Sequence, residues 1–352
     1  MKKLSFKRRT KSEKAIPSRI TNETVAEHRE RILAGGRRFK YPVQYARHKL
    51  VFNTIIITIA TLIVIIAVGW WQLYSVQNTN AFFYRVTRVL PLPVASVDNE
   101  TVRYGDYLMY LNSSTHYLQQ SEQLNLESED GKRQVEDVKR KSMDNVIADA
   151  YAMKLARELK IEVGNDRVDQ VIDDDRNTAN GRISQETYDA SAMNILGWSP
   201  DEYRQDTRSK LVRQEVSYAI DAKANEKQAT AAALLAVDNP DLDKIAAEIG
   251  GEGAAKVGAG VSGLVLRTNR DGGLSAAAAT LEVGKTSAVI KTTTGDGYYF
   301  VKLLEKNDTQ LSYAYIRIPL TVFNEQLAAL KRENKIHEYV SIPATRNQEV
   351  NE

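Results

Sequence analysis

The sequence contains no cysteine, which excludes disulfide bonds, thiolate zinc sites and cysteine nucleophiles. Histidine is also scarce, with four residues in 352, at His28, His48, His116 and His337. Serine and aspartate are plentiful, but no histidine or lysine accompanies them in a recognisable motif, so no nucleophilic site is predicted. We expect no catalytic residue, no metal site and no cofactor, and an enzyme is the less favoured interpretation.

Acidic residues are few in the first fifty residues, where four of them stand beside fifteen of the 48 lysines and arginines. The remainder of the chain is mildly acidic, with a formal charge of about −8. Such a body has no general attraction for nucleic acid, and we expect no nucleic-acid partner for it. With 43% hydrophobic and 26% charged residues, the chain is neither disordered nor a multi-span membrane protein.

One long apolar run, residues 51–74, has no ionisable side chain before its final tyrosine. About 20 apolar residues in a helix cross the hydrocarbon core of a bilayer, so we predict a transmembrane helix over residues 50–74. Trp70, Trp71 and Tyr74 stand at its end, where amphipathic rings favour the membrane interface. The alternatives are a buried core helix or a cleaved signal peptide, but the leader is long and no small-residue cleavage site follows.

Charge predicts the orientation of this span. Residues 72–81, directly after the span, carry no charge. Five basic residues stand shortly before it: Arg37, Arg38, Lys40, Arg47 and Lys49. The positive-inside rule makes residues 1–49 a basic cytoplasmic tail and places the rest outside a cell membrane that the chain crosses once. The tail contains a candidate helix, Asn22–Ala34, capped by Asn22 and closed by two glycines. We expect the basic tail to set the membrane topology and to contact anionic lipid. Contact with RNA is the alternative.

After a predicted linker, residues 75–87, the pattern becomes helical over residues 88–224. A short extended piece, residues 94–102, precedes helical periodicity over Tyr104–Gln123 and Lys132–Leu159. Asn165 is a candidate cap for the next helix. Ser199, followed by proline and two acids, predicts a strong helix start, with the helix running towards Ile220.

Three runs in this region resemble the N-terminal helical domain of SurA-like and PrsA-like chaperones. They are PLPVASVDNETVRYGDYL, IADAYAMKLARELKIEVGNDRVDQVI and MNILGWSPDEYRQDTRSKLVRQEVSYAI, within residues 88–222. The resemblance implies a helical cradle that holds unfolded exported polypeptides. Exposed apolar side chains flanked by polar ones would bind an extended chain without demanding one sequence.

Residues 225–310 predict a small α/β domain, in which helices lead into a strand. Helices are predicted over Glu226–Val237, Leu242–Ile249 and Leu274–Ala279, and a strand over Tyr298–Leu304. The order resembles the parvulin rotamase domain, whose final turn and strand correspond to LEVGKTS at residues 281–287 and GYY at 297–299.

This parvulin-like domain is degenerate. Tyr299 stands where the family has a histidine, and no histidine lies between residues 225 and 320, so the family's paired histidines are not carried over. The resemblance still offers apolar side chains as candidate client contacts: Leu274, Leu281, Tyr298, Tyr299, Phe300 and Ile316.

Residues 311–345 predict a strand, a helix and a strand that complete the fold, followed by a tail, residues 346–352. The alternating run 311–320 predicts a half-buried strand. Two alternatives remain for this strand. It forms a hairpin with the strand before it, with residues 306–309 as the turn, and so takes by permutation the place of the opening strand of the parvulin domain. Otherwise it is an ordinary strand that links back to the helical domain. A helix over Thr321–Asn334 and a strand over His337–Ile342 follow.

Two further motifs are interpreted as structural. The acidic run from Asp173 to Glu186 has calcium-loop ligands in part, but Asn180 occupies the position that requires glycine, so a solvated helix end is expected. The glycines from Gly258 to Gly263 match a phosphate-binding pattern, but no acidic residue follows in a strand about 20 residues on, so a turn is expected.

The sequence therefore predicts an α+β fold: one N-terminal transmembrane helix, an exported helical chaperone domain and a degenerate parvulin-like α/β domain. The favoured function is that of a membrane-anchored extracytoplasmic chaperone, a holdase without isomerase activity. An active prolyl isomerase and a structural subunit of a cell-envelope assembly are the alternatives. Expected partners are unfolded or assembling exported polypeptides, the bilayer through residues 51–74, and in the last alternative an envelope complex.

Overall fold

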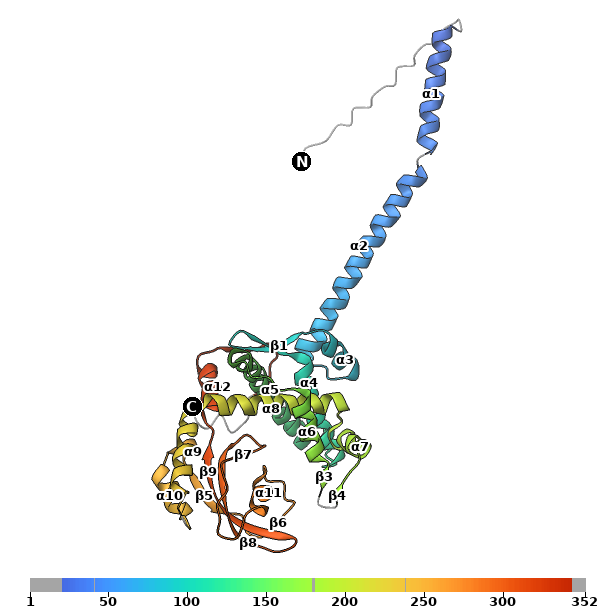
Figure 1. Cartoon of the computed structure of the whole chain (residues 1–352). Coiled ribbons are helices and arrows are strands. Elements are labelled where there is room, and N and C mark those ends of the chain that lie inside the picture. Colours follow the sequence, from blue (N-terminus) through green and yellow to red (C-terminus); the bar gives the residue numbers. More distant parts are fainter. Residues whose placement is uncertain (1–20, 41, 179–180, 238, 344–352) are drawn as a thin grey trace. The chain divides into compact units, whose positions relative to one another are not determined.

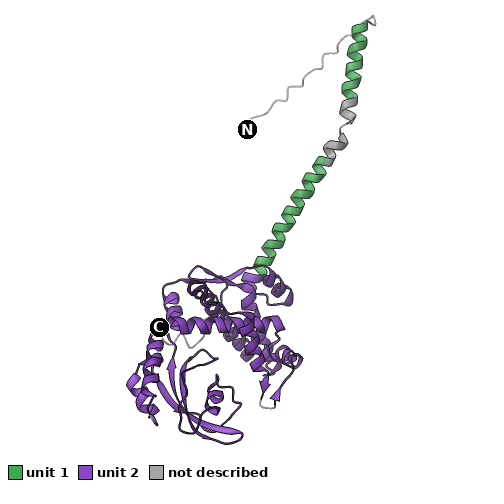
Figure 2. Ribbon diagram, viewed as in Figure 1, with its two compact units in different colours: residues 1–72 green, residues 73–352 purple. Residues whose placement is uncertain are grey.

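A computed structural model describes residues 21–40, 42–178, 181–237 and 239–343. The chain divides into two compact units, residues 1–72 and 73–352 (Figure 2). The first 20 residues of the predicted basic tail and the predicted C-terminal tail, residues 346–352, lie outside the described residues.

The described part of the first unit, residues 21–40 and 42–72, is mainly helical. Helix α1 (Asn22–Lys40) is followed by α2 (Pro42–Trp70), and a short π-helix, η1 (Trp71–Ser75), continues α2 across the boundary between the two units. The prediction that the first helix ends at Ala34 is wrong, because α1 runs through Gly35 and the glycine after it. Glycine costs only about 1 kcal/mol in a helix interior, which a longer helix tolerates.

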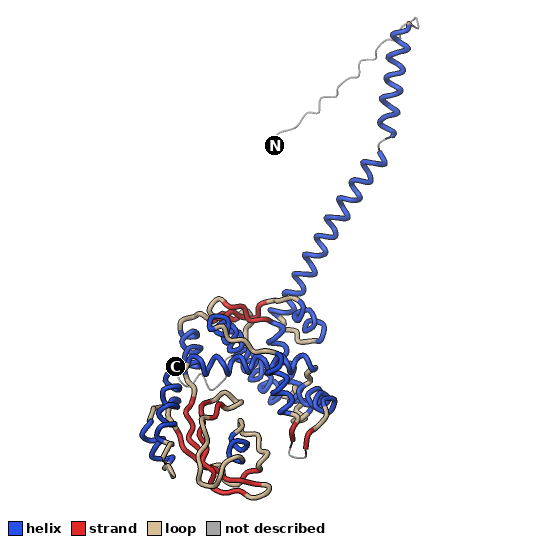
Figure 3. The backbone as a smooth tube through the Cα atoms, viewed as in Figure 1, coloured by secondary structure: helices blue, strands red, loops and turns tan. Residues whose placement is uncertain are grey.

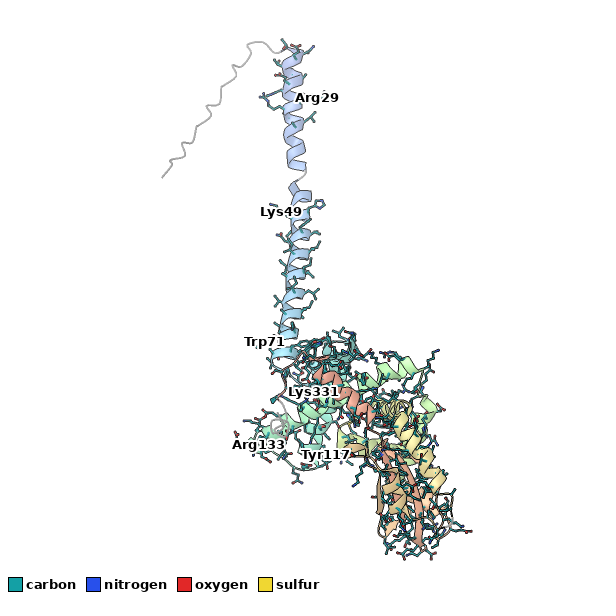
Figure 4. All side chains as sticks on the ribbon, turned by 90° about the vertical axis from the view of Figure 1, so that its left-hand side faces the viewer. Arg29, Lys49, Trp71, Tyr117, Arg133 and Lys331 are labelled. Atoms are coloured by element: carbon teal, nitrogen blue, oxygen red, sulfur yellow. The ribbon has the colours of Figure 1, made fainter. Side chains whose placement is uncertain are left out.

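The apolar segment is one continuous helix from His48 to Ser75, and an 18-residue window within it has a mean hydropathy of 2.7. It is long and apolar enough to cross a membrane, and every residue from 51 to 68 is exposed. The hydroxyls of Thr54 and Thr58 each donate to the carbonyl oxygen four residues earlier, at 2.8 Å. These two polar groups are therefore satisfied within the helix itself, as an apolar solvent requires. Lys49 and Trp71 lie near the two ends of the segment (Figure 4).

The predicted linker, residues 75–87, contains a helix. Helix α3 (Ala81–Val89) begins where the Asn80 side chain accepts a hydrogen bond from the backbone N–H of Phe83 at 3.1 Å. Gly105 allows α3 to approach the next helix closely, since a Cβ at that glycine would lie 2.6 Å from a backbone oxygen of α3. Leu73 is buried, and its carbonyl accepts the Tyr104 hydroxyl at 2.6 Å, so the body begins at the end of the apolar helix.

The helical lobe contains five helices. A hairpin of two short strands, β3 (Asn177–Thr178) and β4 (Gly181–Arg182), projects beside them (Figure 1). The helices are α4 (Tyr104–Gln120), α5 (Glu129–Leu159), α6 (Asn165–Asp175), α7 (Gln185–Leu196) and α8 (Pro200–Ile220). The predicted start of α8 is confirmed, because Ser199 and Glu202 form a capping box around its first turn. The predicted cap at Asn165 is wrong by one residue, since Gly164 is the N-cap.

A three-stranded antiparallel sheet, in the order β10-β1-β2, joins the helical lobe to the end of the chain. Strands β1 (Pro93–Val97) and β2 (Glu100–Arg103) form a hairpin, and β10 (Ile336–Glu338) pairs with the outer side of β1. Helix α12 (Val322–Arg332) precedes β10. The guanidinium of Arg140 on α5 donates to both carboxylate oxygens of Glu338, at 2.7 and 2.9 Å, which fixes β10 to the lobe.

The second lobe is a twisted antiparallel sheet with helices on both faces (Figures 1 and 3). The strand order is β5-β9-β8-β7, and β6 also pairs with β9. The elements are α9 (Ala222–Leu234), α10 (Leu242–Ile249), η2 (Gly253–Ala255), β5 (Gly258–Val261), β6 (Val265–Leu266), α11 (Leu274–Ala279), β7 (Ile290–Lys291), β8 (Gly297–Lys306) and β9 (Gln310–Pro319).

Both faces of this sheet are covered. Tyr298 and Phe300 of β8 pack in the core beneath α9 and α10, whereas Tyr299, Val301 and Leu303 pack in the core beneath α11. Successive side chains of a strand point to opposite faces, so a strand that is buried on both sides is apolar without alternation. This explains the continuous apolar run in β8.

Of the two alternatives for residues 311–320, the structure has the hairpin with the strand before it. Strands β8 and β9 pair antiparallel, with Phe300 opposite Ile316, and β9 lies between β8 and β5. The expected turn at Gly258–Gly263 is in part wrong, because its first four residues form β5. Gly260 there lies against the Tyr315 ring, since an added Cβ would be 2.7 Å from the phenolic oxygen.

The calcium-like run contains the hairpin of β3 (Asn177–Thr178) and β4 (Gly181–Arg182), with Asn180 outside the described residues. The Asp173 carboxylate accepts hydrogen bonds from Arg176 and Arg182. In the part of the chain that the structure describes, no group of three or more histidine or acidic side chains is placed to hold a metal ion.

Candidate functional site

A cavity of about 580 Å³ opens between β2, α4, α5 and α8, and we call it the helical-lobe groove. Its lining comprises Glu100, Thr101, Val102, Arg103, Asp106, Met109, Tyr110, Val146, Asp149, Ala150, Met153, Arg157, Asn165, Asp201, Arg204, Gln205, Arg208 and Ser209. The volume lies in the range of pockets that hold drug-sized ligands or a few side chains of a peptide.

The floor of the groove is apolar. Val102, Met109 and Val146 are buried, whereas Ala150 is half-buried and Met153 is 40% exposed. Val146, Ala150 and Met153 are spaced by four and three residues on α5, so they lie on one face of that helix. Methionine has a flexible, polarizable side chain that adapts to differently shaped partners. The floor therefore offers apolar contact of low shape specificity.

The rim of the groove carries charged side chains of both signs. Four arginines face three acidic residues at its edge: Arg103, Arg157, Arg204 and Arg208 against Glu100, Asp106 and Asp201. Arg157 pairs with Glu100, Arg204 pairs with Asp169 at 2.5 Å, and Arg208 donates to the Asn165 side chain. Exposed pairs of this kind contribute only about 0–1 kcal/mol to stability, so the rim solubilises the groove without selecting one sign of charge.

Three buried polar side chains lie at the base of the groove, one on each of its main helices. The Tyr110 hydroxyl on α4 lies 2.8 Å from Asp149 Oδ2 on α5 and 3.0 Å from Asp206 Oδ1 on α8. Two cations complete the cluster, with Arg213 3.2 Å from Asp149 and Lys210 2.8 Å from Asp206. We call these five residues the Tyr110 cluster. It joins the three helices beneath the floor.

Burial controls the charges in the Tyr110 cluster. Burial raises the pKa of Asp149, and the nearby Arg213 offsets this only in part. Burial and the two carboxylates also raise the pKa of Tyr110, which therefore stays neutral. A neutral phenol has one proton and can donate to only one carboxylate at a time.

A second cavity of about 510 Å³ lies where the two lobes meet, between α8, α12 and the turn before β8. Its lining includes Lys210, Arg213, Asp296 and Arg317. Arg317 donates to Asp296 at 3.1 Å. Gln214 of α8 joins the two lobes here, because its side-chain amide donates to the carbonyl of Thr292, in the turn before β8, at 2.6 Å. The cavity therefore belongs to a hydrogen-bonded joint between the lobes.

Most of the client contacts predicted in the second lobe are core residues. Tyr298, Phe300 and Ile316 lie in the core beneath α9 and α10, and Leu274 and Tyr299 in the core beneath α11, with Leu281 partly buried against it. The Tyr299 hydroxyl donates to Asp296 at 2.7 Å, and the Tyr298 hydroxyl donates to Asn225. In this conformation a client cannot reach the five core side chains, so we place the proposed client contact elsewhere.

The accessible apolar residues are different ones. Met153 is exposed in the groove, and Val261, Leu264 and Leu266 are exposed along the β5–β6 edge of the second lobe. Helical periodicity alone groups Met153 with the core positions of α5, since it lies at the same spacing. No local signal separates a covered apolar position from an uncovered one, because that depends on which elements pack against it.

Two of the three residues predicted at the membrane interface are exposed, namely Trp70 and Trp71. Tyr74 differs, because its hydroxyl donates to the carbonyl of Pro93 at 2.6 Å and its ring packs edge-on against Tyr104, with centroids 5.6 Å apart. Tyr74 therefore contributes to the junction of the apolar helix with the body.

These features define an α+β protein with one apolar helix long enough to cross a membrane and a helical lobe that contains an open groove. Residues 45–217 match the sequence model of the SurA-like N-terminal domain. This part of the chain is similar to the SurA-like N-terminal domain, and the similarity supports a chaperone-like foldase role. The match contains every residue of the helical-lobe groove and ends before the second lobe. No curated protein matches the chain.

Proposed function

We propose that the protein is a membrane-anchored extracytoplasmic holdase that binds unfolded or assembling exported polypeptides and does not isomerise prolyl bonds. The observation that carries the proposal is the helical-lobe groove, which lies wholly within the SurA-like domain. It combines an apolar floor that includes a methionine with a rim of both charge signs, which suits binding that tolerates many sequences.

Client binding would use apolar contact first. Ala150 and Met153 present accessible carbon surface at the floor, and each square ångström of apolar area removed from water contributes about 25 cal/mol. The paired arginines of the rim offer hydrogen-bond donors to the carbonyl groups of an extended client. Weak contacts of this kind let a client leave when it folds.

Anchoring and orientation rest on the apolar helix and on the charge beside it. The helix is long enough to cross a bilayer, and basic residues precede it, which favours a cytoplasmic N-terminus. Protease added to intact cells should digest the body, residues 73–352, and leave the segment before the span protected. Protection of the body, under conditions that digest known surface proteins, contradicts this orientation.

The holdase proposal is tested with the full chain in lipid nanodiscs, by the suppression of aggregation of a chemically unfolded client. Met153→Gln removes apolar contact from the groove and keeps a good helix former of similar length. We expect the concentration for half-protection to rise about three- to tenfold, for a loss of about 1 kcal/mol of contact.

The matched control is Leu159→Gln on the same helix. Leu159 is 46% exposed, similar to Met153, but does not line the groove. We expect its half-protection concentration to equal that of the wild type. Equal effects of the two substitutions place client binding outside the groove, and no protection by the wild type at excess contradicts the holdase function itself.

The absence of isomerase activity is a separate prediction. Tyr299, at the position of the parvulin histidine, donates its hydroxyl to Asp296 within the fold, and no histidine lies between residues 225 and 320. A proline-peptide assay should give the rate seen in buffer, where isomerisation takes tens of seconds. A faster rate would favour the isomerase alternative, and a single stoichiometric partner in a membrane pull-down would favour the envelope-subunit alternative.

A further inference from the structure

Helix α3 presents an apolar stripe that no described residue covers. Phe82 is 66% exposed, Val89 is 80% exposed, and Leu90 directly after the helix is also exposed. At about 100° per residue, Phe82, Arg85 and Val89 lie within about 60° of one another around the helix axis. Arg85 is exposed too. The stripe therefore combines large apolar side chains with one cation.

The opposite face of α3 is fixed to the helical lobe, so the stripe cannot turn inward. Thr87 is fully buried, Tyr84 donates its hydroxyl to Glu202, and Arg88 donates to Gln205 at 2.6 Å. Both acceptors lie on α8. The same inner face of α3 also packs closely against Gly105 of α4. The direction of the stripe is thus set by the folded body.

The stripe also lies close in the chain to the apolar helix. That helix ends at Ser75 and α3 begins at Ala81, so the five intervening residues span at most about 18 Å when fully extended. The intervening chain is itself anchored, because Gln77 donates its side-chain amide to the carbonyl of Ser341 at 2.7 Å. Leu73, within the apolar helix, is buried in the body. Only five residues of the chain separate the end of the span from the helix that carries the stripe.

We propose that α3 lies on the outer surface of the bilayer, with Phe82, Val89 and Leu90 in the interfacial layer and Arg85 beside the lipid phosphates. The inference rests on the proposed membrane anchoring and deepens it. A short amphipathic helix with aromatic and aliphatic side chains on one face binds in this layer. Continuity with the span favours lipid over a client as the occupant, because the tether holds the stripe within reach of the headgroups.

The test uses the absence of cysteine in the chain, which makes single-cysteine labelling free of background. Phe82→Cys and Val89→Cys are labelled with an environment-sensitive fluorophore in full-length protein in nanodiscs, and quenching by lipids with spin-labelled acyl chains is measured. Val261→Cys is the matched negative control, since Val261 is an apolar residue of the second lobe that is 61% exposed. Ile63→Cys, in the middle of the span, is the positive control.

We expect labels at residues 82 and 89 to be quenched several-fold more strongly than the label at residue 261. Quenching at both stripe positions equal to that at residue 261, with strong quenching at residue 63, overturns the inference and leaves the anchoring intact. Weak quenching at residue 63 contradicts the anchoring, and the inference with it. The two stripe positions are independent, so either labelled variant decides the question if the other does not fold.

Discussion

Removal of a single hydroxyl group tests whether the Tyr110 cluster holds the helical lobe together. Tyr110→Phe keeps the aromatic ring, which packs edge-on against Trp198 with centroids 6.1 Å apart, and deletes the one atom that contacts both Asp149 and Asp206. Both carboxylates are almost fully buried and keep their cationic partners. The loss is therefore one charge-assisted hydrogen bond and no salt bridge.

The expected cost follows from these contacts. Hydrogen bonds to charged groups contribute about 1.5–3 kcal/mol, and the partial compensation by Arg213 and Lys210 favours the lower half of that range. We expect Tyr110→Phe to lower the free energy of unfolding by about 1.5–2 kcal/mol. Urea denaturation of the full chain in detergent, followed by circular dichroism, should show a lower midpoint with an unchanged slope.

The effect should also depend on pH. Because burial raises the pKa of Asp149, its stabilising contribution is complete below its unfolded value of about 3.9 and declines as the pH rises through the folded value. The hydroxyl of Tyr110 stabilises the charged form of Asp149. The difference between Tyr110→Phe and the wild type should therefore be smallest below about pH 3.9, where Asp149 is protonated in both states, and should grow as the pH rises through the folded pKa of Asp149.

The control is Tyr117→Phe, at an exposed position on the same helix, α4. A surface substitution of this kind changes stability by no more than about 0.5 kcal/mol. Equal midpoints for Tyr110→Phe and Tyr117→Phe would refute the reasoning, because they would show that the cluster contributes nothing beyond ring packing.

Three further predictions concern other parts of the fold. Gly105→Ala places a Cβ 2.6 Å from a backbone oxygen of α3, so we expect a loss of about 1–3 kcal/mol in thermal or urea unfolding, whereas Gly258→Ala, whose Cβ meets nothing within 4 Å, should unfold like the wild type. Arg140→Lys keeps the charge but loses the two-pronged contact with Glu338, so amide hydrogen exchange in β10 should quicken, by about fivefold for a loss of 1 kcal/mol; unchanged exchange would contradict the role of this pair. Burial alone would raise the pKa of Asp271, but hydrogen bonds from neighbouring side chains and backbone lower the pKa overall. The stability that Asp271 provides is therefore present at neutral pH and is lost as the pH falls below about 4. Asp271→Asn should reduce stability at neutral pH and flatten its decline in acid, and parallel pH profiles for variant and wild type would contradict the assignment.

The sequence by itself determined the features that depend on neighbouring residues. Composition identified the apolar run of α2, and cap chemistry identified the capping box before α8. Periodicity identified the bounds of α10 and α11. Each of these is set by interactions along the chain, which a linear pattern records.

Only the tertiary structure decided which apolar residues are covered and which are not. Tyr299 and Met153 are both apolar positions in regular elements, yet one is buried beneath α11 and the other lies open in the groove. The segment taken for a linker is a helix because the lobe gives its inner face contacts from α4 and α8. Periodicity identifies the apolar face of an element, but whether that face meets protein, lipid or client depends on residues that are distant in the sequence.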